Sequence, residues 1–167
     1  MEAFSTLAEV AVGLAGFGSI AIVLAREEGW SGSDLFRISS FLMASLGALF
    51  LALLPIGLAQ SALSEAAIWR ITSGVAGLAG LTLMFVNLRM RARYLDPSLY
   101  LGPALTALIT VTVTAVVIAQ GFNIAATGAA PSATAPFFGV VWLLAYACLV
   151  LVRVLFFRPG RNLSEDS

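Results

Sequence analysis

The sequence predicts an all-α integral membrane bundle of five transmembrane helices, and three observations support this class. Five runs are apolar and long enough to cross a hydrocarbon core of about 30 Å, which takes roughly 20 helical residues. Only 11% of the 167 residues are charged and the mean hydropathy is +0.98, whereas about 25% of the residues in a soluble domain are charged. All nine positive charges are arginines, and they are distributed very unevenly between the runs.

The five runs cover most of the chain and leave only short connections between them. The longest connection is the stretch 123–136, so the sequence leaves no room for a separate soluble domain. We therefore expect residues 1–167 to form a single membrane domain. Its expected spans are 3–25, 35–63, 66–88, 99–122 and 137–157, followed by a tail at 158–167.

The first two runs each carry one informative feature. A secretory signal has basic residues before a short apolar core, whereas this chain starts with Met1 and Glu2, and Arg26 follows a longer run. We therefore expect the first run to remain in the protein as a span. The second run contains Pro55, which lacks the backbone donor of a normal helical turn and predicts a kink.

Boundary residues separate the later runs. Ser64 precedes the third run and predicts an N-cap, because its hydroxyl can accept a bond from a free backbone N–H group. Pro97 disfavours helical geometry at Asp96 and divides the third run from the fourth. The uncharged stretch 123–136 divides the fourth from the fifth, in which Arg153 can extend its charge to the headgroups.

The arginines predict the orientation of the bundle. With five spans the two ends of the chain lie on opposite sides, so one side carries eight arginines and the other carries only Arg70. Cytoplasmic loops are enriched in arginine, so we expect the N-terminus outside and the C-terminus in the cytoplasm. The arginines on the cytoplasmic side are Arg26, Arg37, Arg89, Arg91, Arg93, Arg153, Arg158 and Arg161. We interpret them as topology determinants facing anionic lipid headgroups, and not as a nucleic-acid surface.

Small residues at a spacing of four predict close packing between helices. In the second run they are alanines, and in the fourth they include threonines, whose hydroxyls can add a hydrogen bond. A hydroxyl-lined pathway is the alternative interpretation, although threonine can also return its bond to its own helix. The two sets are Ala44, Ala48 and Ala52, and Gly102, Thr106, Thr110 and Thr114.

A four-residue motif that occurs twice adds four glycines to the packing candidates. Gly13-Leu14-Ala15-Gly16 in the first run recurs as Gly77-Leu78-Ala79-Gly80 in the third, 64 residues later. Both runs cross the membrane in the same direction, so a duplicated hairpin followed by a fifth helix is conceivable. In a chain this rich in glycine, alanine and leucine, a chance match is the alternative.

Glu9 is the most informative polar residue, because it lies about six residues, or roughly 9 Å, inside the first span. A carboxylate there is costly unless it reaches water, pairs or is protonated. It can lie in the outer headgroup layer, bond a neighbouring helix, or form a ring at the mouth of an oligomeric pore. On a helical wheel it shares a face with Gly13, Gly16, Ile20 and Val23.

Three further polar residues lie near the outer ends of the second and fourth runs, on the same side as Glu9. They are Gln60, Gln120 and Asn123, and with Glu9 they are the candidates for one polar or ion-binding cluster.

The inventory of reactive side chains favours a protein without catalytic activity. Histidine is absent and Cys148 is the only cysteine, so no pattern for a metal, a haem or a catalytic triad is present, and we expect no cofactor. The leading hypothesis is a helix-packing or accessory subunit that works as a homo-oligomer or within a larger membrane complex. The alternative is a homo-oligomeric ion channel or permeation module with Glu9 at its outer mouth. The lack of lysine and the abundance of alanine suggest a bacterial inner membrane.

The arginine distribution predicts which positions an impermeant thiol reagent can reach in intact cells. In a Cys148→Ala background, a cysteine replacing Glu2 or placed in 127–132 should react, whereas Gly32→Cys and Ser164→Cys should not. Labelling of Ser164→Cys in intact cells would exclude the five-span orientation.

Overall fold

The computed structural model describes residues 1–24, 32–93, 103–126 and 131–156. Within these residues the chain is all-helical, with five helices and no strand. Each helix is long and apolar enough to cross a membrane, which confirms the predicted class. The helices are α1 (Glu2–Leu24), α2 (Gly32–Leu58), α3 (Glu65–Arg93), α4 (Pro103–Ala125) and α5 (Thr134–Phe156).

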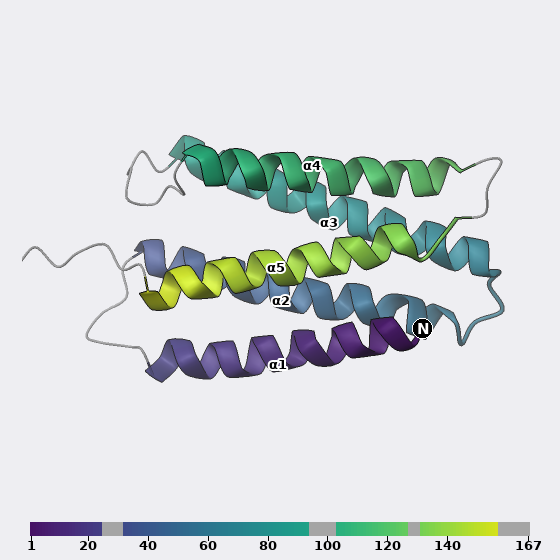
Figure 1. Cartoon of the computed structure of the whole chain (residues 1–167), viewed down its shortest axis with the longest axis horizontal. Helices are drawn as coiled ribbons and strands as arrows, with labels where there is room; N and C mark the ends of the chain where they lie inside the picture. The colour runs from purple at the N-terminus through teal and green to yellow at the C-terminus, as the bar shows by residue number, and fades with distance from the viewer. Residues whose placement is uncertain (25–31, 94–102, 127–130, 157–167) are drawn as a thin grey trace, which may run out of the picture.

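Consecutive helices run in opposite directions, so the start of α1 and the end of α5 lie at opposite ends of the bundle (Figure 1). We name these ends after their terminal helical residues, the Glu2 end and the Phe156 end. The Glu2 end also contains the C-terminal ends of α2 and α4 and the N-terminal ends of α3 and α5. This arrangement is the one that an odd number of spans requires.

Several helix boundaries differ from the runs expected from hydropathy. α2 ends at Leu58 and not at 63, because Gln60 N bonds Gly57 O at 3.1 Å and Ser61 N bonds Leu58 O at 3.0 Å in tight closing turns. α3 continues to Arg93, five residues beyond the apolar run. The described part of α4 begins at Pro103, a residue that suits the first helical position because its missing N–H leaves no bond unmade.

The expected cap at Ser64 is present, whereas the kink expected at Pro55 stays a prediction. Ser64 caps α3, with the backbone N–H of Ala67 donating to its Oγ at 3.3 Å. Pro55 lies inside α2 and is fully buried. The connection between α4 and α5 is shorter than 123–136, because α4 runs on to Ala125 and α5 already begins at Thr134.

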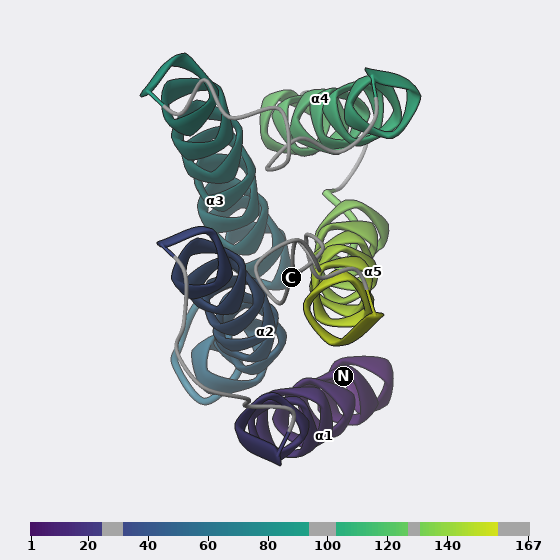
Figure 2. The ribbon, with the colours of Figure 1, turned by 90° about the vertical axis from the view of Figure 1, so that its left-hand side faces the viewer.

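The core lies among α1, α2, α3 and α5, and α2 with α5 forms its most extensive helix pair. Ala44, Ala48 and Ala52 are completely buried, so the small-residue face of α2 allows close approach of its neighbours. Toward the Glu2 end, Phe4 of α1 stacks on Trp69 of α3 with ring centroids 5.6 Å apart. α1 and α4 lie on opposite sides of the bundle, with the other three helices between them (Figure 2).

Toward the Phe156 end, a second apolar cluster depends on one glycine. Phe41 of α2 is completely buried, and the tip of its ring lies against Gly18 of α1. A Cβ atom at Gly18 would overlap Cζ of that ring, which has no free space into which to move. Gly13, on the same helix, has nothing within 4 Å of such an atom.

These two glycines form a matched pair for testing the packing of α1. Gly18→Ala should destabilise the bundle by about 1–3 kcal/mol through overpacking. Gly13→Ala should leave stability unchanged or raise it by up to about 1 kcal/mol, through higher helix propensity. Thermal unfolding in mild detergent measures both. An unchanged melting temperature in Gly18→Ala would contradict the contact between Gly18 and Phe41.

Candidate functional site

The four polar candidates do not form one cluster. Gln120 and Asn123 come together at the Glu2 end, where α4 meets α3 and α5. Glu9 is exposed on α1, on the opposite side of the bundle from α4 (Figure 2). Gln60 is exposed in the turn after α2. The sequence places all four near one end of the bundle, but its linear order cannot say which helices are neighbours.

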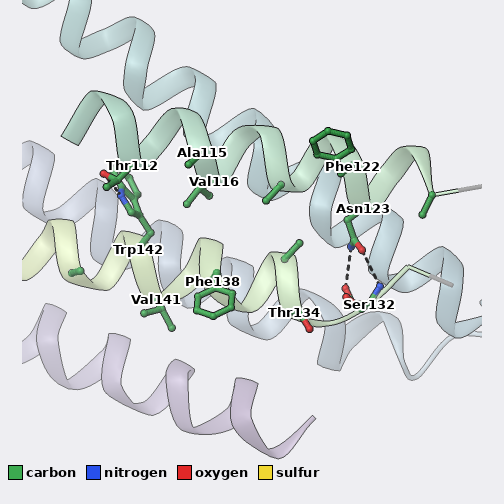
Figure 3. A pocket seen from close by; sticks show the side chains of 14 residues that line it. Thr112, Ala115, Val116, Phe122, Asn123, Ser132, Thr134, Phe138, Val141 and Trp142 are labelled. Carbon is green, nitrogen blue, oxygen red and sulfur yellow. Dashed lines mark hydrogen bonds between the residues drawn. The ribbon is translucent and has the colours of Figure 1, made fainter. Parts of the chain in front are cut away.

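Asn123 connects three segments of the chain through its carboxamide. Its Nδ2 donates to Ser73 Oγ of α3 at 2.7 Å and to the carbonyl of Ser132 at 3.0 Å. Its Oδ1 accepts from the backbone N–H of Ser132 at 2.9 Å (Figure 3). Both atoms of the carboxamide are therefore satisfied, and α4 is fixed to α3 and to the segment that leads into α5.

Gln120 lies one turn earlier on α4 and is almost completely buried, with 1% of its surface exposed. Its Nε2 donates to the carbonyl of Ala135 at 2.7 Å. Two glycines make room for it, since a Cβ atom at Gly139 would lie 3.1 Å from Nε2 and one at Gly77 would lie 3.4 Å from the Cβ of Gln120. Oε1 of Gln120 is buried and has no hydrogen-bond partner. Half of this carboxamide is thus satisfied.

Two more hydrogen bonds attach α4 to its neighbours. Arg70 of α3 donates to the carbonyl of Ala126, just past α4, at 3.2 Å. Nε1 of Trp142 on α5 donates to Oγ1 of Thr112 at 3.0 Å. We call the set Ser73, Gln120, Asn123, Ser132 and Ala135 the α4 junction.

Apolar burial contributes less to the attachment of α4 than to that of the other helices. In the most apolar 18-residue stretch of α4 only 11% of the residues are buried, the smallest share among the five described helices. Its buried residues in the structure are Val113 and Gln120. The sequence indicates Gln120 and Asn123, but it gives no signal for their partners, because Ser73 and Ser132 have the composition of ordinary helix and loop positions.

The two copies of the repeated four-residue motif have different environments. Gly77 and Gly80 are buried, and a Cβ atom at Gly80 would lie 2.9 Å from Cγ2 of Val117 on α4. Gly13 and Gly16 have nothing within 4 Å of an added Cβ atom. The glycines of α3 are therefore covered by α4, whereas no helix among the described residues lies against the open side of Gly13 and Gly16.

Glu9 belongs to the same open face of α1. Glu9 and Gly16 are exposed, Gly13 is partly exposed, and Ile20 and Val23 are 57% and 66% exposed. We call these five residues the α1 face. They combine a carboxylate, two glycines and apolar side chains along the length of one span.

The threonine stripe of α4 also faces away from the rest of the chain. Thr110 and Thr114 are exposed, and their hydroxyls donate to the carbonyls of Thr106 and Thr110 at 2.9 and 2.7 Å. The bonds therefore return to the same helix and join no second helix of this chain. Thr106 is partly buried, and Gly102 lies outside the described residues.

The described arginines divide between the two ends of the bundle. Arg70 is at the Glu2 end, and Arg37, Arg89 and Arg153 are toward the Phe156 end. Arg89 is exposed, with its guanidinium 5.7 Å from the centroid of the Phe85 ring. Arg26, Arg158 and Arg161, together with the side chains of Arg91 and Arg93, lie outside the described residues.

Arg37 differs from the expectation of a headgroup-facing charge, because only 6% of its surface is exposed. It lies five residues inside α2, or about 7.5 Å along the helix. Arg153 of α5 is also partly buried and lies within electrostatic range of Arg37.

These residues therefore do two things: hydrogen bonds attach α4 to α3 and α5, and the α1 face is left open. Across the described ranges, no three histidine, cysteine or acidic side chains come together that could hold a metal ion. Comparisons of the chain with models of protein families, with curated proteins and with solved structures gave no match.

The α4 junction predicts unequal effects for its two carboxamides. Asn123→Leu loses three hydrogen bonds and should lower stability by about 1–2 kcal/mol, because an interhelical bond in a membrane contributes roughly 0.6 kcal/mol on average. Gln120→Met loses one bond but also removes a buried acceptor without a partner, so its effect should be close to zero. Unfolding in detergent ranks the two variants. A larger loss in Gln120→Met would mean that Oε1 has a partner, such as a bound water.

Proposed function

We propose that this chain is a non-catalytic multi-span membrane protein that acts as a helix-packing or accessory subunit within the bilayer. The observation that carries the proposal is the α1 face, which has the composition of a helix contact but is left uncovered by the four other helices that the structure describes. Residues of this kind usually lie between transmembrane helices, because glycines allow two backbones to approach closely.

The energetic argument rests on Glu9. A carboxylate directed at lipid inside a span carries a cost that is reduced when it bonds another helix or reaches water. Glu9 lies seven residues from the first residue of α1, about 10 Å along the helix axis. A partner helix against Gly13 and Gly16 would also cover this carboxylate and supply a donor to it. The partner is a second copy of the chain or a helix of a larger membrane complex.

The second candidate is a homo-oligomeric ion channel or permeation module. In a symmetric oligomer that joined through the α1 face, the Glu9 carboxylates would form a ring that attracts cations. The exposure of Glu9 supports this arrangement. Ile20 and Val23 weigh against it, because they continue the face as an apolar surface that offers no polar groups to a permeating ion.

The orientation and location belong to the same proposal. We place the Glu2 end outside and the Phe156 end in the cytoplasm of a bacterium, with the chain in the inner membrane. The eight-to-one arginine distribution supports the orientation, and the amino-acid composition supports the source. The lipid bilayer is then the first partner of the chain, and no nucleic acid or cofactor takes part.

A bulky residue on the α1 face should abolish the proposed contact without affecting the fold. Gly16→Leu should shift the protein in mild detergent from an oligomer or complex to a monomer, as measured by light scattering. Gly121→Leu is the matched control, because Gly121 of α4 is also exposed with nothing within 4 Å of an added Cβ atom. Both variants should keep the wild-type melting temperature. The proposal is wrong if Gly16→Leu and Gly121→Leu leave the assembly state equally unchanged.

Glu9→Gln distinguishes the two candidate functions in the same preparations. For a packing subunit, the amide retains a hydrogen bond to the partner, so that assembly persists and vesicles show no protein-dependent cation flux. For a channel, wild-type vesicles conduct cations and Glu9→Gln reduces the flux while the oligomer stays intact. Flux of this kind would favour the channel over the packing subunit.

A further inference from the structure

An open groove of about 910 Å³ lies between α4 and α5 on the outer surface of the bundle (Figure 3). Its walls are mostly apolar, and alanines contribute many of the contacts. Ligand sites between helices usually measure about 300–1,000 Å³ and combine apolar walls with a few polar groups. The groove has this size and composition, and it is distant from the α1 face.

α4 and α5 are joined by hydrogen bonds at two points along the groove, and several of the side chains that line it are small. At one point, Trp142 Nε1 donates to Thr112 Oγ1 at 3.0 Å. At the other, Gln120 and Asn123 bond the first residues of α5 and the segment before it. Between these points the walls include Ala115 and Ala119, which are too short to fill the space between the helices, together with Val116, Phe138 and Val141.

The length of the groove indicates which molecule occupies it. Thr112 and Asn123 are eleven residues apart on α4, which corresponds to about 16 Å of helix. This is roughly half of a 30 Å hydrocarbon core, or the depth of one leaflet. A helix that crosses the membrane would need a groove of full height, whereas a lipid chain of one leaflet needs only half.

The polarity of the two ends agrees with a lipid. The end formed by Ser132 and Thr134 is exposed at the Glu2 end of the bundle, where headgroups lie (Figure 3). Their hydroxyl groups can donate to ester or phosphate oxygens. Toward the other end the wall includes the indole of Trp142, which stacks on Tyr146 with ring centroids 5.5 Å apart.

We propose that this groove is a binding site for one acyl chain of a phospholipid from the leaflet at the Glu2 end, with its headgroup beside Ser132 and Thr134. Lipid tails are as apolar as the groove walls, so hydrophobicity provides no net gain over bulk lipid. Retention comes from dispersion contacts along the shaped walls and from the hydroxyl groups at the open end. This proposal stands independently of the assembly through the α1 face.

The test uses the quenching of Trp142 fluorescence by a phospholipid that carries a nitroxide near the end of one chain. The full-length protein is titrated in mild detergent, and the Trp142 signal is the component that Trp142→Phe lacks. In the wild type, quenching should saturate at one lipid per chain. Ala115→Phe fills the groove and should raise the lipid concentration for half-maximal quenching about tenfold, or about 1.4 kcal/mol.

Ala107→Phe is the matched control, since Ala107 is an exposed alanine of α4 outside the groove. It should bind lipid as the wild type does. Ala119→Leu provides a smaller obstruction that decides the matter if Ala115→Phe lowers the melting temperature. Native mass spectrometry should find one retained phospholipid in the wild type and in Ala107→Phe, and none in the groove-filling variants.

Two results would overturn the lipid site. One is quenching that increases without saturation and to the same extent in all variants, because Trp142 then meets only bulk lipid. The other is a disulfide between two copies of Ala119→Cys, made in a Cys148→Ala background, which would show that protein occupies the groove.

Discussion

The structure depends on one constraint, namely that polar groups inside the hydrocarbon layer must find partners within the protein. Each helix pairs its own backbone N–H and C=O groups in this way. Several hydroxyl groups also bond a carbonyl of their own helix. Ser45, Thr72 and Thr114 each donate to the carbonyl four residues earlier at 2.7–2.9 Å. The carboxamides of Gln120 and Asn123 and the indole of Trp142 instead bond partners outside their own helices. These hydrogen bonds all involve α4.

The bundle therefore uses two kinds of helix attachment. α1, α2, α3 and α5 share apolar clusters in which small residues admit large ones, as Gly18 admits Phe41. α4 depends more on hydrogen bonds at a few points, and between those points it does not close against α5. The groove lies along these attachments, where its walls combine alanines such as Ala115 and Ala119 with larger apolar side chains such as Phe138.

The open surfaces of the protein differ in shape and therefore in what they can bind. The α1 face presents a carboxylate and two glycines along a full span, which suits another transmembrane helix. The groove between α4 and α5 extends over half a span and ends in hydroxyl groups, which suits a lipid chain. The contacts that we propose for both surfaces lie within the bilayer, and they are compatible with one non-catalytic role in which assembly and lipid binding coexist.

Length and hydropathy are local properties, and so the sequence by itself determined the five spans, the antiparallel order that places the chain ends apart, and the cap at Ser64. It also indicated the residues whose polarity has consequences in a membrane, among them Glu9, Gln120 and Asn123. It could not determine which of these residues meet, and the tertiary structure separated Glu9 from the other two.

The same limit applied to the small residues, since Gly77 and Gly80 are covered by α4 whereas the identical motif at Gly13 and Gly16 remains open. The physical reason is that these helices are apolar on every side, so no amphipathic pattern identifies the packed face. Lipid is as apolar as the helix surfaces, and shape complementarity and a few hydrogen bonds therefore decide the pairing. Those features exist only once the helices lie side by side.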